Sequence, residues 1–278
     1  MLVATELPIR YQGVLAALTD YDFVIAPVCL KFMEYRMFNA AQRRKGRFVV
    51  LDNGTFEGEL LEVEKLLDLV KLIHPQEVIA PDIIGNREET VRLARDFCVK
   101  LRNESLFCQV QVCPQGNSFE DWLQCYQELV DLPQVSSIGV SYVGHFEFPE
   151  DRDYFGPDMA PEETIRLRFF HYLVGRGLLR GDKRYHLLGL YSPSALSWYA
   201  RYPFIRSIDT SFPIVCALRG DRMDEGTRKP PGKLDYNSEL TDEALALAVR
   251  NVLWMKEECN EITRGEASWR RCRVRALR

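Results

Sequence analysis

Residues 48–82 read FVVLDNGTFEGELLEVEKLLDLVKLIHPQEVIAPD, a stretch whose pattern indicates the class of fold. It opens on the apolar run Phe48–Leu51 and closes on a second run, Glu77–Ala80. Both runs are short and lack clean polar alternation, which is typical of parallel strands buried on both faces. Between them, apolar residues recur with the period of a helix: Leu60, Val63, Leu67, Val70 and Ile73. The stretch therefore predicts two parallel strands joined by a right-handed helical crossover.

The same alternation continues along most of the chain. Further strands are predicted at Phe23–Val28, Phe107–Val112, Ser137–Ser141, His186–Leu190 and Arg206–Asp209. An eighth strand would close a barrel; the sequence leaves its position open, with Ile214–Leu218 as one candidate, and a doubly wound open sheet is the alternative. We therefore predict an α/β fold, a (β/α)8 TIM-type barrel in a single domain with long βα loops at 143–160 and 219–240.

Two helix starts and one domain boundary can also be placed. Asn86 and Ser118 stand just before helical stripes and are predicted as their N-caps. The barrel is expected to occupy residues 1–260, and residues 261–278 are expected to form a separate Arg-rich tail.

Length and composition agree with one soluble domain of this size. The chain has 278 residues, of which 46% are hydrophobic and 27% charged, and a barrel needs about 250. No apolar run approaches the roughly 18 residues that span a bilayer, and the N-terminus lacks a signal pattern. These features predict a cytoplasmic protein with no membrane partner. Its eight cysteines are then expected to be reduced, buried thiols.

Three aspartates, Asp52, Asp82 and Asp209, follow apolar runs at the carboxyl ends of predicted strands. Functional residues of a parallel barrel gather at these ends. Desolvating a carboxylate beside a buried run is costly, so such a carboxylate is expected to have hydrogen-bond partners or a functional role. The structural alternative is that each aspartate caps the helix that follows. Two carboxylates facing one substrate suit glycosyl transfer, in which one attacks the anomeric carbon and the other handles protons.

Several strand-end segments resemble those of the tRNA-guanine transglycosylases. Residues 52–57 (Asp-Asn-Gly-Thr-Phe-Glu) look like the family's Asp-Ser-Gly-Gly-(Phe/Tyr)-Gln segment. Residues 184–190 are similar to its Arg-Tyr-Leu-Met-Gly-Val segment, and Gln115-Gly116 matches its Gln-Gly turn. Asp209 falls where the family has its strand-end nucleophile. The order and spacing of these motifs agree along residues 22–215.

The resemblance implies a role for each matching residue. Asp209 would attack C1′ of a guanosine nucleotide and hold the sugar covalently, and Asp52 would deprotonate the incoming base. Asp82 would accept hydrogen bonds from the base's N–H groups. The other base-binding positions implied are Asn53, Gln115, Gly139, Phe56 and Leu188, with Phe56 and Leu188 on the two faces of the base. The partners implied are a nucleic acid and a free 7-deazaguanine base such as preQ0, and no cofactor is implied.

The chain departs from the family downstream of the nucleophile. The tRNA enzymes carry Cys-x-Cys-x-x-Cys and a distant His there, whereas this chain has only Cys216, Cys259 and Cys272 and no histidine. Isolated cysteines predict no structural zinc and no other metal. In this respect the chain resembles the short, zinc-less paralogues, many of them encoded by phages, that act on DNA in the host cytoplasm. We expect DNA as the partner, with tRNA as the alternative, and the resemblance leaves room for a homodimer.

Two basic clusters could contact the phosphates of a nucleic acid despite the net charge of −4. One is Arg43 with Arg44, just before the strand at 48–51. The other lies in the tail and includes Arg270, Arg271 and Arg273. The bland interpretation is a charged loop and a solvated tail. A non-catalytic nucleic-acid-binding subunit and a nucleoside enzyme on the same barrel also stay open as functions.

Overall fold

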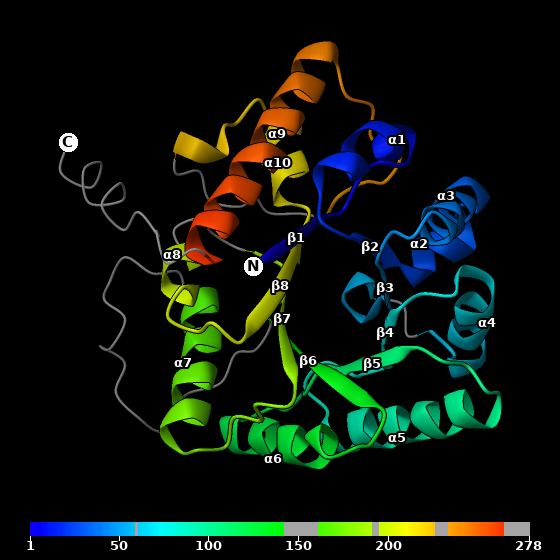
Figure 1. Cartoon of the computed structure of the whole chain (residues 1–278), viewed down its shortest axis with the longest axis vertical. Coiled ribbons are helices and arrows are strands. Elements are labelled where there is room, and N and C mark those ends of the chain that lie inside the picture. Colours follow the sequence, from blue (N-terminus) through cyan, green and yellow to red (C-terminus); the bar gives the residue numbers. More distant parts are fainter. Residues whose placement is uncertain (59–60, 142–160, 191–194, 226–232, 264–278) are drawn as a thin grey trace. The chain divides into compact units, whose positions relative to one another are not determined.

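The fold is an eight-stranded parallel α/β sheet, seen in a computed structural model that describes residues 1–58, 61–141, 161–190, 195–225 and 233–263 (Figure 1). Within these ranges the strands are β1 Leu2–Thr5, β2 Asp22–Ile25, β3 Val49–Asp52, β4 Glu77–Ile79, β5 Gln109–Val112, β6 Val135–Ser141, β7 Arg184–Leu188 and β8 Ile205–Thr210. Their order in the sheet is β1-β8-β7-β6-β5-β4-β3-β2. Each strand lies beside its sequence neighbour and β1 lies beside β8, without the reversal of order found in doubly wound sheets. The (β/α)8 TIM-type prediction is confirmed.

The helices alternate with these strands. They are α1 Gln12–Leu15, α2 Ala26–Lys31, α3 Met33–Arg44, α4 Val63–Ile73, α5 Arg87–Asn103, α6 Phe119–Val130, α7 Pro161–Gly175, α8 Leu196–Tyr199, α9 Phe212–Leu218 and α10 Asp242–Thr263. The predicted N-caps are confirmed, because the Asn86 side chain accepts from the Glu89 amide and the Ser118 side chain accepts from the Asp121 amide. The last of these helices, α10, runs across residue 260, where the sequence placed the boundary between barrel and tail.

The strand that completes the set of eight is the N-terminal segment, and the prediction of Ile214–Leu218 is wrong. β1 pairs with β8 in parallel, with Val3 opposite Ile208. Ile214–Leu218 belongs to the buried helix α9, whose first turn contains Pro213. A short helix that is apolar on all sides cannot be told from a buried strand by periodicity. The proline was the available signal, since it fits the first turn of a helix.

The strand predicted at Phe23–Val28 is also shorter than expected. β2 ends at Ile25, and the chain enters α2, which has Pro27 in its first turn. This turn, with α3, occupies a segment for which the sequence predicted no helix. The apolar run continues across the junction because both the strand and the first turn of α2 are buried.

The chain divides into two compact units, which are described separately. Unit 1 contains Met1–Asp20, Asp151–Leu179 and Leu187–Arg278, and unit 2 contains Tyr21–Glu150 and Arg180–His186. Unit 2 carries β2 to β6 with helices α2 to α6 (Figure 1), and unit 1 carries β1, β8 and helices α1 and α7 to α10. The boundary falls inside β7, so its first three residues belong to unit 2 and its last two to unit 1.

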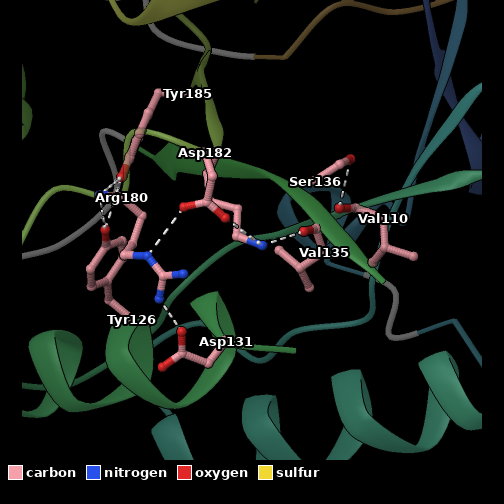
Figure 2. Close-up of polar contacts among 9 residues, drawn as sticks. Val110, Tyr126, Asp131, Val135, Ser136, Arg180, Asp182 and Tyr185 are labelled. Atoms are coloured by element: carbon pink, nitrogen blue, oxygen red, sulfur yellow. Dashed lines mark hydrogen bonds and ion pairs between the residues drawn. The ribbon is translucent and has the colours of Figure 1, made fainter. Parts of the chain in front are cut away.

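The turn that leads into β7 is held in unit 2 by polar contacts with α6 (Figure 2). The hydroxyls of Tyr126 and Tyr185 lie 2.8 Å apart. The backbone N–H of Arg180 donates to the Tyr185 hydroxyl at 3.1 Å, and the Arg180 guanidinium forms an ion pair with Asp131. These contacts fix where β7 begins, and therefore which of its residues reach its carboxyl end.

The segment 219–240 is less of a surface loop than the sequence suggested. In its described parts, Met223, Leu234 and Tyr236 are buried in unit 1. The Met223 amide donates to the side chain of Asn251 on α10, and the Ile9 amide donates to the Tyr236 carbonyl. Residues 226–232, like the other predicted long loop at 143–160, lie outside the described residues.

The cysteines behave as expected where they are described. Seven are free thiols, and all of these except Cys108 are buried. Burial raises the pKa of the Cys29 thiol to about 12, so this thiol is protonated at neutral pH. In the described part of the chain, no helix is both long and apolar enough to cross a membrane.

Candidate active site

The three strand-end aspartates do not cap the helices that follow them. The cap of α5, after Asp82, is Asn86. The N-cap position of α9, after Asp209, is occupied by Ser211. At the end of β3, the Asp52 carboxylate accepts from the Gly54 amide at 3.0 Å, two residues along, which is a turn contact rather than a helix cap. The capping interpretation is therefore wrong for all three, and their positions need another reason.

In unit 2, Asp82 is the centre of a buried hydrogen-bonded group that we call the Asp82 cluster: Asp82, Asn53 and Gln115. Asn53 Nδ2 donates to Asp82 Oδ1 at 2.7 Å, and Gln115 Nε2 donates to Asp82 Oδ2 at 2.5 Å. All three residues are buried. Each carboxylate oxygen thus has one amide donor and keeps further acceptor capacity, because an ionised carboxylate has about four lone-pair sites.

The sheet brings the cluster together. β3 pairs with β4 and β4 with β5, all in parallel, so the residues just beyond their carboxyl ends become neighbours. Asn53 follows β3 directly and also donates to the Ala80 carbonyl at 2.7 Å. The backbone N–H of Gln115 donates to Cys125 Sγ on α6 at 3.3 Å, which fixes the turn after β5. Thr55, whose part the sequence did not reveal, donates its hydroxyl to the Asp82 carbonyl oxygen at 3.0 Å.

The electrostatics of Asp82 are set by burial. Desolvation raises its pKa above the ordinary value of 3.8, and the hydrogen bonds from Asn53 and Gln115 act in the opposite direction because they favour the charged form. A buried carboxylate whose two oxygens are held by amides is a preorganised acceptor. It suits a ligand with two adjacent N–H groups in one plane.

Beside this cluster, Asp52 and Phe56 are more accessible. Asp52 is partly exposed at the end of β3. Phe56 lies in the short 3-10 turn Thr55–Glu57, and its exposed fraction is 46%. An exposed aromatic side chain can cover one face of a planar ligand, and Phe56 is three residues from Asn53 in the chain. Gly139, also predicted to contact the base, is buried inside β6 rather than beyond its end.

Two of the strand-end glycines are explained by the packing of the protein itself. A Cβ on Gly54 would lie 2.3 Å from Cδ and Cγ of Pro27 in α2. A Cβ on Gly116 would lie 2.4 Å from the backbone nitrogen of Trp122 in α6. Packing against Pro27 and Trp122 is therefore a sufficient reason for glycine at both positions.

Gly54 therefore supplies a stability prediction with a matched control. Gly54 has φ +81 and no room for a Cβ, whereas Gly58 has φ +85 and open space around it. Gly58→Ala should cost about 1 kcal/mol of unfolding free energy, from the left-handed backbone alone. Gly54→Ala should cost at least about 2 kcal/mol more, because overpacking adds to the backbone cost. Urea denaturation of both variants measures the difference, and equal losses would show that Pro27 moves aside without cost.

In unit 1, Asp209 lies on β8 and is buried, with 4% of its surface exposed. Its Oδ1 accepts from the Gly189 amide at 3.3 Å. Leu188, the last residue of β7, precedes that amide directly and is partly exposed. The structure thus brings two predicted site residues, Asp209 and Leu188, to the carboxyl ends of adjacent strands.

The predicted nucleic-acid contacts are placed differently. Arg43 and Arg44 end α3 and precede β3, so they lie at the amino end of a strand whose carboxyl end leads to the Asp82 cluster. β3 itself, four residues long at about 3.3 Å per residue, separates them from the cluster. Arg43 Nε donates to the His74 carbonyl at 2.7 Å, whereas Arg44 is exposed. Arg270, Arg271 and Arg273 lie outside the described residues.

Among the described residues, no group of three or more His, Cys, Asp or Glu side chains could hold a metal ion. Neither a protein-family model nor a curated protein sequence matches this chain. A function has to be inferred from the chemistry of the two sets of strand-end residues.

Proposed function

We propose that this chain is a base-exchange glycosyltransferase that replaces guanine in DNA with a 7-deazaguanine base of the preQ0 type. The observation that carries the proposal is the Asp82 cluster: a buried carboxylate whose two oxygens are already oriented by Asn53 and Gln115. Its remaining lone pairs suit the adjacent ring N–H and amino N–H groups of a guanine-like base. Phe56, exposed nearby along the chain, suits one face of that base.

The proposed reaction conserves the glycosidic bond energy in two steps. A carboxylate oxygen of Asp209 attacks C1′, the bond from C1′ to the guanine nitrogen breaks, and guanine leaves with the bonding pair and takes up a proton from water. Asp52 then removes a proton from the incoming base, whose nitrogen attacks C1′ and releases the Asp209 carboxylate. Two inversions retain the configuration at C1′, and no nucleoside triphosphate is needed.

A base inside a duplex cannot present C1′ to a carboxylate, so the target nucleotide has to leave the stack. DNA is proposed over tRNA because the sequence after Asp209 lacks the cysteines and histidine of the zinc segment in the tRNA enzymes it resembles. The runner-up is a zinc-free enzyme that acts on tRNA.

The test is a base-exchange assay on both polymers. Guanine-labelled DNA or tRNA is incubated with the protein and excess 7-deazaguanine base, and released label is counted against an Asp209→Ala control. We expect loss of label from DNA. Loss from tRNA alone would establish the runner-up, and no loss from either polymer above the control would refute the proposal. A non-catalytic binding subunit would bind polymer without any release.

The salt dependence of DNA affinity distinguishes which of the two basic clusters binds phosphates. Removing residues 264–278 should weaken DNA binding and flatten the slope of log affinity against log salt, by about 0.9 for each phosphate that the tail neutralises. Binding of free base should not change. The double change Arg43→Ala and Arg44→Ala, at the amino end of β3, provides the comparison. An unchanged slope in the shortened chain would show that the tail does not bind DNA phosphates. A flattened slope in the double variant would show that Arg43 and Arg44 bind them.

A further inference from the structure

Unit 1 contains a fully buried arginine that sequence analysis did not single out. Arg166 lies on α7, and none of its surface is exposed to solvent. Burying a guanidinium costs several kcal/mol or more unless its N–H groups are satisfied, so its location is specified by its partners. Those partners identify which part of the fold it serves.

The Arg166 guanidinium is directed at the carboxyl end of β7. Its Nη1 donates to the Gly189 carbonyl at 2.8 Å and to the Leu188 carbonyl at 3.3 Å. Its Cζ lies 5.4 Å from the centre of the Tyr199 ring on α8, within the range of a cation–π contact. Successive carbonyls of an extended chain point in opposite directions. Gly189, with φ +73, supplies the turn that lets both carbonyls face one nitrogen.

The same peptide group also contacts Asp209. The Leu188 carbonyl that accepts from Arg166 and the Gly189 N–H that donates to Asp209 Oδ1 are the two ends of one peptide bond. A cation on the carbonyl end polarises the amide and strengthens the N–H as a donor. Arg166 thus acts on the Asp209 carboxylate through the peptide group that joins Leu188 and Gly189.

We propose that Arg166 is a positioning residue for Asp209. It holds the peptide between Leu188 and Gly189 in place, and that peptide fixes one oxygen of the carboxylate and so its plane. Leu188, predicted to lie against the base, is fixed by the same hydrogen bonds. This inference rests on the proposed function, in which the Asp209 carboxylate has to meet C1′ in line with the departing base.

The test measures the rate at which a covalent protein–DNA adduct forms in a single turnover. Arg166→Met removes the charge and the donors. It should slow adduct formation by about 10²-fold, the size expected when a reacting group is misplaced by about 1 Å. The DNA concentration needed for half-maximal rate should change little. Arg166→Lys, which keeps a charged donor for the Gly189 carbonyl, should restore part of the rate.

The control is Leu173→Ala, a cavity-forming change at another buried position of α7. It should destabilise the protein yet keep the rate of adduct formation at a temperature where it stays folded. If Arg166→Met does not fold, Arg166→Gln keeps a neutral donor and should still be at least about tenfold slower than the unmodified chain. A rate in Arg166→Met or Arg166→Gln equal to that of Leu173→Ala would overturn the inference. Absence of adduct in the unmodified chain would instead overturn the proposed function.

Discussion

Replacing Asp209 with asparagine is expected to abolish the covalent adduct and to slow guanine release by at least about 10⁴-fold. The asparagine amide has the shape of the carboxylate, and its oxygen can still accept from the Gly189 amide, as Asp209 does at 3.3 Å. Folding should therefore be preserved. The amide is not a competent nucleophile, so the glycosyl ester cannot form. Denaturing electrophoresis of protein mixed with labelled DNA, followed by intact-mass measurement, detects the adduct.

Asp52→Asn provides the matched comparison. The proposed role of Asp52 is confined to deprotonating the incoming base, so its asparagine variant should still form the adduct and release guanine. Resolution by the incoming base should be slow, and the adduct should accumulate. An adduct in Asp209→Asn, or equal loss of adduct in both variants, would contradict the assignment of roles.

Acidification is expected to weaken the binding of a guanine-like base at a pH above the usual titration range of an aspartate. Burial raises the pKa of Asp82 above its ordinary value of 3.8. As the pH falls through this raised pKa, the carboxyl is protonated, loses acceptor capacity and turns an O–H toward the N–H donors of the base. Binding should therefore be strongest above the raised pKa. Base affinity measured by calorimetry across pH gives the midpoint.

The raised pKa of Asp82 also makes the stability of the folded protein depend on pH. A raised carboxyl pKa means that the folded state holds the proton more tightly than the unfolded chain does. The stabilisation from protonated Asp82 is fully present below the ordinary pKa and is lost as the pH rises through the folded value. Two N–H donors from a ligand favour the carboxylate and therefore act against this effect of burial.

Asp82→Asn should lower base affinity by about 10²-fold at neutral pH, since hydrogen bonds to a charged group contribute about 1.5–3 kcal/mol each. The loss of base affinity at acidic pH, which we call the acid limb of the binding curve, should disappear. Asp22→Asn is the control, because Asp22 is another buried aspartate of unit 2 with a raised pKa, placed at the amino end of β2 beside Arg47. An acid limb that persists in Asp82→Asn, or vanishes in Asp22→Asn, would show that Asp82 is not the acceptor.

Local signals account for the parts of the fold that could be predicted. Asn86 and Ser118 cap their helices through contacts three residues away, which a sequence displays directly. Parallel strands are buried on both faces, so most of them appear as short apolar runs. β1 was missed because it is a run of four residues whose identity as a strand depends on pairing with β8, about 200 residues later.

In the site too, local features could be predicted from the sequence, whereas contacts between distant residues could not. The sequence predicted which residues stand at the ends of β3, β4 and β5, because the order of strands implies it. It did not show that Asn53 and Gln115 hold Asp82, since those bonds depend on distances between strands. Arg166 gave no signal at all, because its burial depends on carbonyls 22 and 23 residues further along the chain. Likewise, Gly54 is required by Pro27, which no local pattern connects to it.

The most direct measurement of base exchange is nucleoside mass spectrometry of a DNA oligonucleotide incubated with the protein and preQ0. We expect a 7-deazaguanine deoxynucleoside in the DNA, formed in a one-to-one ratio with free guanine and absent with Asp209→Asn. Unchanged guanine content in DNA, together with no free guanine, would contradict it.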